Sequence, residues 1–153
     1  MTRKLSIALV LAILAAGCME GQKPEPVKRA AGKSLYDRLG GDKAIAKVVD
    51  DFVANVVADA KIKDVHKKHF KEGDVAGLKR KLIDQIGEAT GGPEKYKGKN
   101  MKDAHQGLKI TDEEFDALVG DLVKALDNNK VGKAEKDELL GLLGPMRTDV
   151  VEK

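Results

Sequence analysis

Apolar residues recur along most of the chain at three-, four- and seven-residue spacing, which is the period of an α-helix with one apolar face. The longest series follows the glycine pair at 40–41 and consists of Ile45, Val48, Val49, Phe52, Val53, Val56 and Val57. Three later series of the same kind fall within 75–89, 115–126 and 139–146. No alternating, strand-like pattern persists beyond a few residues. The sequence therefore predicts an all-α fold with four main helices.

Polar and conformationally special residues mark where these helices begin and end. Side chains that can accept hydrogen bonds from free backbone N–H groups predict helix starts at Ser34, Asp42, Asp74 and Thr111. Glu114, three residues after Thr111, completes a capping box. The glycine pair at 40–41 predicts the end of a short first helix, and Asn128–Asn129 the end of the third long one. Pro145 is expected to bend or interrupt the last helix.

Two segments do not follow the helical pattern. Residues 61–71 are basic, contain His66 and His69, and are not assigned to an element. Residues 91–110 are rich in Gly and Lys and contain the third histidine, His105. This connection of about twenty residues far exceeds the two to eight that are typical between packed helices. A loop of this length is expected to carry function.

The composition is that of one globular domain. Of the 153 residues, 42% are hydrophobic, which is enough to build a core. Aromatic residues make up only 3% and Trp is absent, which disfavours a surface on which nucleic-acid bases stack. The net charge is +3 with 35% charged residues of both signs, whereas a polyanion-binding protein usually has a more one-sided charge. We expect no nucleic-acid partner, and a monomer or weak dimer.

The N-terminal residues have the pattern of an export signal. Arg3 and Lys4 precede an apolar run at 5–16 that is too short to span a bilayer as a stable helix. The run leads through small residues into Cys18, the only cysteine, as in bacterial lipoprotein signals. Met19 is not the acidic residue associated with inner-membrane retention, which favours the periplasmic face of the outer membrane.

These features divide the chain into three parts. We predict a lipoprotein-type signal peptide at 1–17, a lipidated tether at 18–33 and the globular domain at 34–153. The alternative is an ordinary secretory signal that is cleaved nearby.

Three ordered motifs resemble those of the group I truncated haemoglobins. They are S-L-Y-D-R-L-G-G at 34–41, G-G-P at 91–93 with Y-x-G at 96–98, and M-K-x-x-H-x-G-L-x-I-T at 101–111. The match extends from there to the last helix. It implies a two-over-two helical sandwich that holds haem b, with His105 as the proximal iron ligand. A neutral imidazole is a standard anchor of haem iron, and the long loop would bring His105 under the porphyrin.

The resemblance also implies which side chains surround the haem. Those expected on the proximal side are Tyr96, Met101, Leu108 and Ile110. The remaining expected contacts are Phe52, Val53, Phe70, Leu78, Leu82 and Phe115.

On the distal side this chain departs from the family's pattern. Val53 stands where the family has a tyrosine that donates a hydrogen bond to bound oxygen, and Leu78 and Leu82 stand where relatives often have glutamine. A hydrogen bond of this kind contributes about 1.5–3 kcal/mol, or one to two orders of magnitude in affinity. Tight oxygen storage is therefore not expected, whereas nitric oxide depends less on such a donor.

Two polar residues lie near the distal positions on a helical wheel. Gln85 falls on the same apolar stripe as Leu78, and Lys81 falls at the edge of that stripe. Some relatives coordinate their own iron through the residue at the position of Lys81. The resemblance therefore implies two alternatives: a deprotonated Lys81 is the distal iron ligand, or Lys81 extends to solvent or pairs with a haem propionate.

His66 and His69 lie three residues apart and would share one face of a helix. Two histidines without a third ligand are a weak metal site. We interpret them as part of a solvated basic face, which would also hold the domain near an anionic membrane. The alternative is that one of them swings over the haem.

The leading hypothesis is a membrane-tethered haem protein that reversibly binds oxygen and nitric oxide outside the cytoplasm. Oxygen transport and nitric oxide dioxygenation are activities that this resemblance leaves open, and the reductase that would serve as partner is not identified by the sequence. A second hypothesis is electron transfer or redox sensing through a six-coordinate haem closed by Lys81. A third is a helical scaffold without haem.

Overall fold

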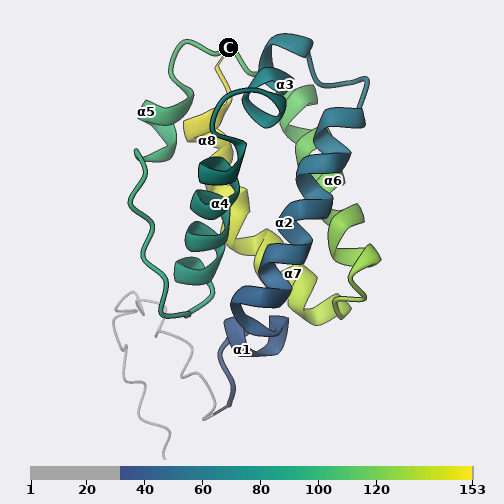
Figure 1. The fold of residues 1–153 in the computed structure, drawn as a ribbon, viewed down its shortest axis with the longest axis vertical. Helices are drawn as coiled ribbons and strands as arrows, with labels where there is room; N and C mark the ends of the chain where they lie inside the picture. The colour runs from purple at the N-terminus through teal and green to yellow at the C-terminus, as the bar shows by residue number, and fades with distance from the viewer. Residues whose placement is uncertain (1–31, 153) are drawn as a thin grey trace, which may run out of the picture. The chain divides into compact units, whose positions relative to one another are not determined.

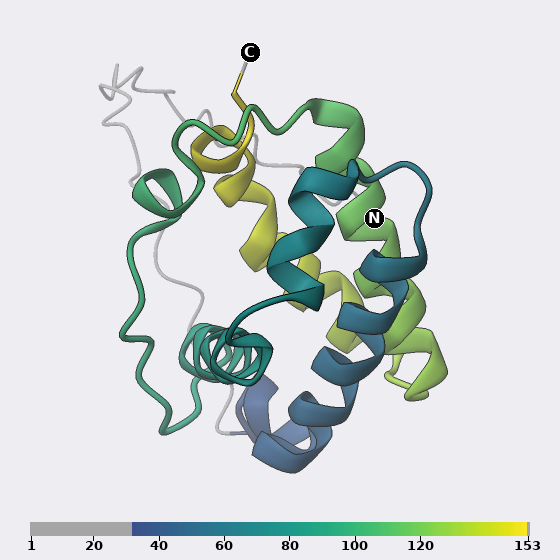
Figure 2. The same ribbon diagram turned by 45° about the horizontal axis from the view of Figure 1, so that its top comes forward.

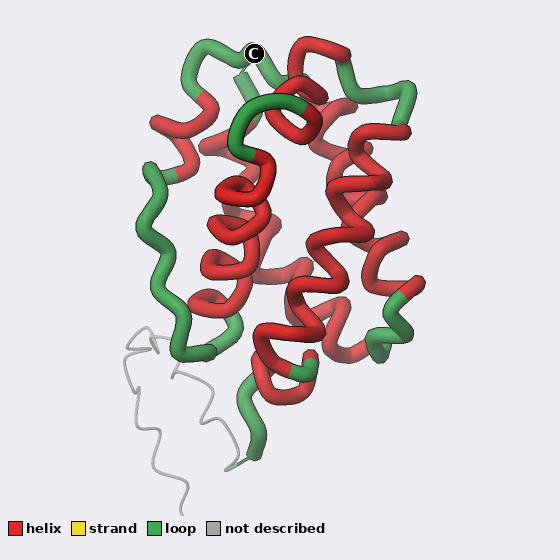
Figure 3. Tube along the Cα trace, in the orientation of Figure 1, coloured by secondary structure: helices red, strands yellow, loops and turns green. Residues whose placement is uncertain are grey.

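The computed structural model describes residues 32–152, which form eight α-helices and one short 3₁₀-helix. The predicted signal peptide, Cys18 and the tether up to residue 31 lie outside the described residues. Figure 3 shows helices and loops but no strand within 32–152, which confirms the predicted all-α fold. No helix in this range is both long enough and apolar enough to cross a bilayer.

The four long helices are the four that the apolar pattern predicts: α2 (Gly41–Ala58), α4 (Val75–Ala89), α6 (Asp112–Asn128) and α7 (Lys133–Leu143). The shorter elements are α1 (Leu35–Leu39), α3 (Asp64–Lys71), α5 (Met101–His105), η1 (Gly144–Met146) and α8 (Arg147–Val150). The basic segment left unassigned from sequence therefore contains a helix, α3. The expected interruption at Pro145 is confirmed, because α7 ends at Leu143 and η1 contains the proline.

α2 is the central helix of the fold. It packs against α6 and α4, and also against α1 and α3. In the view of Figure 1, α2 and α4 lie in front of α6 and α7, which is a two-over-two arrangement of the long helices. The side chains buried most completely come from both layers, and include Val49, Val56, Leu126 and Leu139. The core therefore forms where the apolar stripes of the long helices meet.

Three of the four predicted helix caps are confirmed. The side chain of Ser34 accepts from the amide of Asp37, and that of Asp74 accepts from the amide of Gly77. Thr111 accepts from the amide of Glu114 in a capping box.

The prediction that Asp42 caps α2 is wrong. Gly40 adopts a left-handed conformation, with φ +97°, and serves both as the C-cap of α1 and as the N-cap of α2. A Cβ atom on Gly40 would stand 2.8 Å from the Cβ of Ala44, closer than two such atoms can approach. Because Gly40 serves both helices, α2 begins at Gly41, two residues earlier than an N-cap at Asp42 would place its start. Asp42 falls within its first turn, where the carboxylate pairs with Arg80 at 2.8 Å.

The connection between α4 and α5 runs back along α4 on the side away from α2, as Figures 1 and 2 both show. Tyr36 of α1 joins the start of this connection to the beginning of α2 through hydrogen bonds. The Tyr36 hydroxyl donates to Glu94 Oε1 at 2.5 Å and accepts from the amide of Asp42 at 3.0 Å. The connection ends in α5, which packs against α8. His105 is thus placed at the end of a segment that is mainly extended chain.

Candidate functional site

An apolar cavity lies among the helices of the described domain. Its volume is about 510 Å³, which is within the range of sites that enclose small molecules and cofactors. Its walls come from α2, α3, α4, α5 and α6, from the loops before α3 and beside α5, and from the C-terminal elements α7, η1 and α8. Eleven of the residues predicted to contact a cofactor line this cavity: Phe52, Phe70, Leu78, Lys81, Leu82, Tyr96, Met101, His105, Leu108, Ile110 and Phe115. Val53 is not in the lining and packs in the core, 5% exposed.

A second hollow, of about 640 Å³, has a different character. It is lined mainly by charged residues and contains no histidine: Asp59, Lys61, Glu113, Asp116, Ala117, Gly120 and Asp121. None of the predicted site residues belongs to it. We therefore place the candidate site in the apolar cavity.

His105 is oriented by a hydrogen bond to its own helix. Its Nδ1 lies 2.7 Å from the carbonyl oxygen of Met101, one turn earlier in α5. Because a carbonyl only accepts, Nδ1 carries a hydrogen, and in the neutral ring Nε2 then has a free lone pair. Nε2 makes no hydrogen bond to any group within residues 32–152. An imidazole with one nitrogen fixed in this way is prepared to bind a metal through the other.

Aromatic and aliphatic side chains form the wall contributed by α2, α3 and α4. Phe52 of α2 and Phe70 of α3 meet edge to face, with ring centroids 6.3 Å apart and an interplanar angle of 85°. Leu78 and Leu82 extend this surface along α4. None of these four side chains can donate a hydrogen bond.

Polar side chains reach the same cavity from α4. The amide nitrogen of Gln85 lies 3.4 Å from the sulfur of Met101 and 3.5 Å from that of Met146. Thioether sulfur is a weak acceptor, so this amide is poorly satisfied and can donate to another group in the cavity. Lys81 lines the cavity and is also exposed, and it has no hydrogen bond or ion pair with residues 32–152.

Glu114, at the start of α6, is the most heavily hydrogen-bonded side chain beside the cavity. It is 5% exposed, and its carboxylate accepts from the backbone amide and the amine of Lys63, from the amide of Thr111 and from the ring of His66. Burial alone would raise the pKa of Glu114, but these donors outweigh it and lower the pKa to about 2. The carboxylate is therefore ionised at any pH near neutrality.

His66 is buried, at 8% exposure, and the interpretation of a solvated basic face is wrong for this residue. The interpretation fits His69, which is exposed. A signal was present in the sequence: Ile62, His66 and Phe70 stand four residues apart, so His66 falls in line with two apolar residues. Its nitrogens are occupied by oxygen acceptors, which removes His66 from any metal-ligand pair with His69.

Glu152, near the C-terminal end of the domain, holds the loop that follows His105. The carboxylate of Glu152 accepts from the amide of Gly107 at 2.6 Å and from that of Lys109 at 2.8 Å. These hydrogen bonds lower the pKa of Glu152. Lys109 has a left-handed backbone, with φ +53°, which costs a non-glycine residue about 1–2 kcal/mol. The loop conformation is thus imposed by contacts outside the loop.

Comparison with known proteins finds one family across the domain. Residues 34–152 match the family model of the bacterial-like globins. A group 1 truncated haemoglobin of Mycolicibacterium paratuberculosis is 33% identical over 123 residues, which cover 80% of this chain and 88% of that protein. One from Tetrahymena pyriformis is 31% identical over 121 residues, covering 79% of this chain and 97% of the relative.

Solved structures of such proteins have the same fold. The crystal structure of the Tetrahymena pyriformis truncated haemoglobin in its Fe(III) form superimposes with a TM-score of 0.71 at 31% identity, covering 79% of this chain and all of that one. The 2/2 haemoglobin of Synechococcus sp. PCC 7002, in the cyanomet state with covalently attached haem, gives a TM-score of 0.70 at 31% identity and the same coverage.

The hydrogen bonds of Glu114 predict a specific dependence of stability on acid. Because the pKa of this carboxyl falls from 4.5 to about 2 on folding, its contribution is complete above about pH 4.5 and is lost as the pH falls towards 2. We expect Glu114→Gln to lower the free energy of unfolding at pH 7 by an amount on the order of 2 kcal/mol. Urea unfolding followed by circular dichroism, in steps between pH 7 and 3, measures this difference.

The difference between wild type and Glu114→Gln should shrink as the pH falls below about 4.5. Glu113→Gln is the matched control, because Glu113 is the exposed preceding residue, and it should follow the wild type throughout. A Glu114→Gln difference that stays constant over the whole range would contradict the assignment.

Proposed function

The chain belongs to the bacterial-like globin family and to its group 1 truncated haemoglobins, and we propose that it holds haem b in the apolar cavity with His105 as the iron ligand. The observation that carries the proposal is the orientation of His105. Its Nδ1–H donates a hydrogen bond to the Met101 carbonyl, so Nε2 is the one ring nitrogen free to bind a metal. No other histidine that lines the cavity offers this combination, because His66 is engaged at both nitrogens and His69 is exposed.

The cavity fits a haem in its chemistry. Most of its lining is aliphatic or aromatic, which suits a flat, largely apolar macrocycle and excludes water from around it. Lys81 and Lys99 line the cavity and are also exposed to solvent, so their amines can pair with carboxylate groups of a ligand that reach the surface. Apolar walls with cations at the edge match an apolar ring that carries anionic substituents.

A bound haem would supply an iron that can bind diatomic gases. Residues of this chain would hold, orient and shield that iron. His105 is held in one tautomer by Met101, and the Phe52–Phe70 pair covers the cavity between α2 and α3. Gln85 carries a weakly satisfied amide that can donate a hydrogen bond within the cavity.

We propose reversible binding of oxygen and nitric oxide, with nitric oxide the better suited of the two. Leu78 and Leu82 line the cavity without a donor, and Val53 brings no hydroxyl and is absent from the lining. A strongly polar ligand gains nothing from these three positions and would depend on a donor elsewhere in the cavity, such as Gln85, whereas nitric oxide depends less on a donor.

A second candidate function rests on Lys81. This side chain lines the cavity and is unpaired within residues 32–152, so its amine is free to approach the iron. A deprotonated Lys81 at the open position would close the site and favour electron transfer or redox sensing over gas binding.

Replacing His105 tests the primary proposal. The full chain, produced with haem available, should contain haem in the wild type and lose most of it in His105→Gly, because no other side chain replaces the imidazole. Lys102→Ala, an exposed neighbour on α5, should retain a wild-type haem-to-protein ratio, measured as the pyridine haemochrome. Added free imidazole should restore haem to His105→Gly. Equal haem content and spectra in wild type and His105→Gly would favour another role for the fold.

Lys81→Ala separates the two candidate functions. Optical spectra of the ferric, haem-loaded full chain are compared at neutral and alkaline pH. An open site predicts a high-spin spectrum in wild type and variant alike. A low-spin wild-type spectrum that becomes high-spin in Lys81→Ala would identify Lys81 as the sixth ligand. Lys79→Ala, two residues earlier on the same helix and outside the cavity lining, should match the wild type in either case.

For the N-terminal residues we propose export and lipidation at Cys18, on the sequence pattern alone. A lipid at this position would tether the haem domain to a membrane, on the periplasmic face of the outer membrane. Cys18→Ser should move the protein from the membrane fraction to the soluble fraction of cells and abolish incorporation of labelled fatty acid. An unchanged membrane fraction in Cys18→Ser would count against lipid anchoring.

A further inference from the structure

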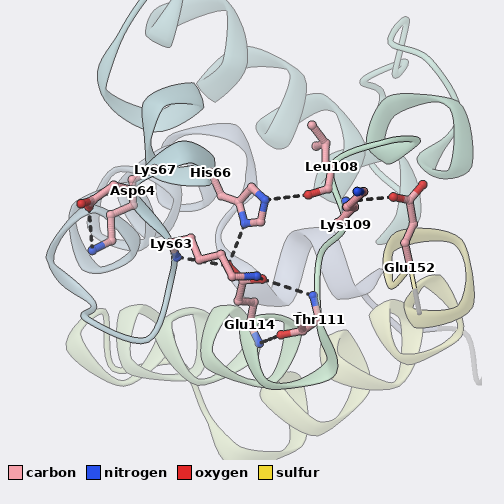
Figure 4. Close-up of polar contacts among 9 residues, drawn as sticks. All are labelled: Lys63, Asp64, His66, Lys67, Leu108, Lys109, Thr111, Glu114 and Glu152. Atoms are coloured by element: carbon pink, nitrogen blue, oxygen red, sulfur yellow. Dashed lines mark hydrogen bonds and ion pairs between the residues drawn. The ribbon is translucent and has the colours of Figure 1, made fainter.

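His66 of α3 joins two parts of the chain that lie far from it in sequence. Its Nδ1 lies 2.7 Å from Glu114 Oε1 and its Nε2 lies 2.8 Å from the carbonyl oxygen of Leu108 (Figure 4). Both partners are acceptors, because Glu114 is ionised and a carbonyl has no proton to give. Both contacts are therefore satisfied together only when both ring nitrogens carry hydrogen. The ring bridges α6 and the loop after α5.

The carbonyl held by His66 belongs to the turn that ends α5. Leu108 follows His105 by three residues, and the amide of Leu108 donates to the carbonyl of His105 at 3.1 Å. The carbonyl that His66 holds and the amide that donates to His105 thus belong to the same residue, Leu108. A displacement of the Leu108 carbonyl moves the backbone that carries the His105 imidazole.

The other end of the bridge is fixed. Glu114 receives hydrogen bonds from Lys63 and Thr111 as well as from His66, and it stands in the first turn of α6. Figure 4 shows these donors gathered around one carboxylate between α3 and α6. Glu114 is therefore a stationary anchor against which His66 holds the loop.

The loop does not hold its own shape. Gly107 and Lys109, on either side of Leu108, both have positive φ, +84° and +53°. Their amides are held by Glu152, and the carbonyl between them is held by His66. Removal of one of these contacts leaves a conformation that a lysine rarely adopts without support.

We propose that His66 is a positioning residue for the iron ligand: through the Leu108 carbonyl it sets where the His105 imidazole stands, and so sets the strength of the iron–histidine bond. The inference rests on the proposed binding of haem by His105. Several charged or titratable side chains lie around the same cavity as His66 and contribute to its electrostatic environment. Those that line the same cavity and carry charge or titrate are His69 from α3, Lys81 from α4, Tyr96 and Lys99 from the loop, His105 from α5 and Glu114 from α6. α2 contributes only apolar residues to this lining.

The two contacts of the His66 ring predict how the position of His105 changes with pH. A neutral imidazole has one N–H and can serve Glu114 or Leu108 but not both. As the pH rises, the loop loses one of its holds, and the His105 imidazole relaxes from the position that it has at lower pH. A side chain that only fills space between α3 and α6 would produce no such transition.

The test uses the full chain loaded with haem and reduced to the ferrous state. The iron–histidine stretching band is recorded by resonance Raman spectroscopy from about pH 5 to pH 9, the range in which histidine changes charge. We expect the wild-type band to shift in one single-proton step. In His66→Phe the band should stand at one displaced position at every pH. His66→Gln keeps one donor and should give an intermediate position.

Lys68→Gln is the control, since Lys68 is exposed on the same helix and outside the cavity lining, and it should reproduce the wild-type band and its shift. Haem transfer to an excess of apomyoglobin should be about two- to tenfold faster from His66→Phe than from wild type, as expected for one lost hydrogen bond.

Two results would overturn the inference while leaving haem binding intact: a wild-type band that does not move with pH, or a His66→Phe band that coincides with the wild type. The pH dependence of the wild-type band needs no variant, so the inference can still be tested if His66→Phe fails to fold. A wild-type chain that takes up no haem would instead overturn the proposed function, and with it this inference, before any change at His66 is made.

Discussion

The segment between α4 and α6 must present an imidazole to the cavity without a long helix to carry it, and the rest of the site depends on how that is done. Four of its backbone amides donate to carboxylates of residues outside the segment. Glu88, Glu152 and Glu114 accept from the amides of Tyr96, Gly107, Lys109 and Thr111. Hydrogen bonds to charged acceptors are stronger than those between neutral groups. Three carboxylates thus hold the parts of the segment that lie outside α5 and have no helical hydrogen bonds.

Apolar packing and hydrogen bonding have different roles at the site. The apolar walls from α2, α4 and α6 enclose the cavity, and burial of apolar surface has no preferred direction. Direction comes from hydrogen bonds: Met101 orients the His105 ring, and His66 and Glu152 hold the loop that follows it. In this chain, packing therefore determines the shape of the globin pocket, and a few polar contacts determine the orientation of His105. Changes to the walls and changes to the contacts should have separable effects on affinity and on iron–ligand geometry.

Helix positions could be predicted from sequence because they are set locally. The apolar period located α2, α4, α6 and α7, and the Thr111–Glu114 box located the start of α6. The error at Asp42 arose because a left-handed Gly40 allows α2 to begin earlier than a capping side chain would. His105 has no periodic signal at all, and only the resemblance to a family singled it out.

The His66–Glu114 contact was beyond local reasoning. Within its own segment Glu114 has a sufficient role as a capping residue, and His66 lies in a run of lysines that predicts a solvated face. The two residues are 48 positions apart, and their contact exists only when α3 has packed beside α6. The four-residue spacing of Ile62, His66 and Phe70 indicates that His66 is buried, but neither segment indicates which residue it contacts. The sequence therefore singled out His105 but not the contacts that hold its loop.

The distance in sequence between these supports and the loop also bears on the order of folding. The groups that hold residues 107–109 lie 42 to 45 positions away along the chain, in α3 and beyond α8. Contacts between such distant segments form after local helices, because the chain must first close large loops. The imidazole therefore acquires its final placement late, once both ends of the domain have docked. A cofactor arriving earlier would meet the apolar walls before it meets its ligand.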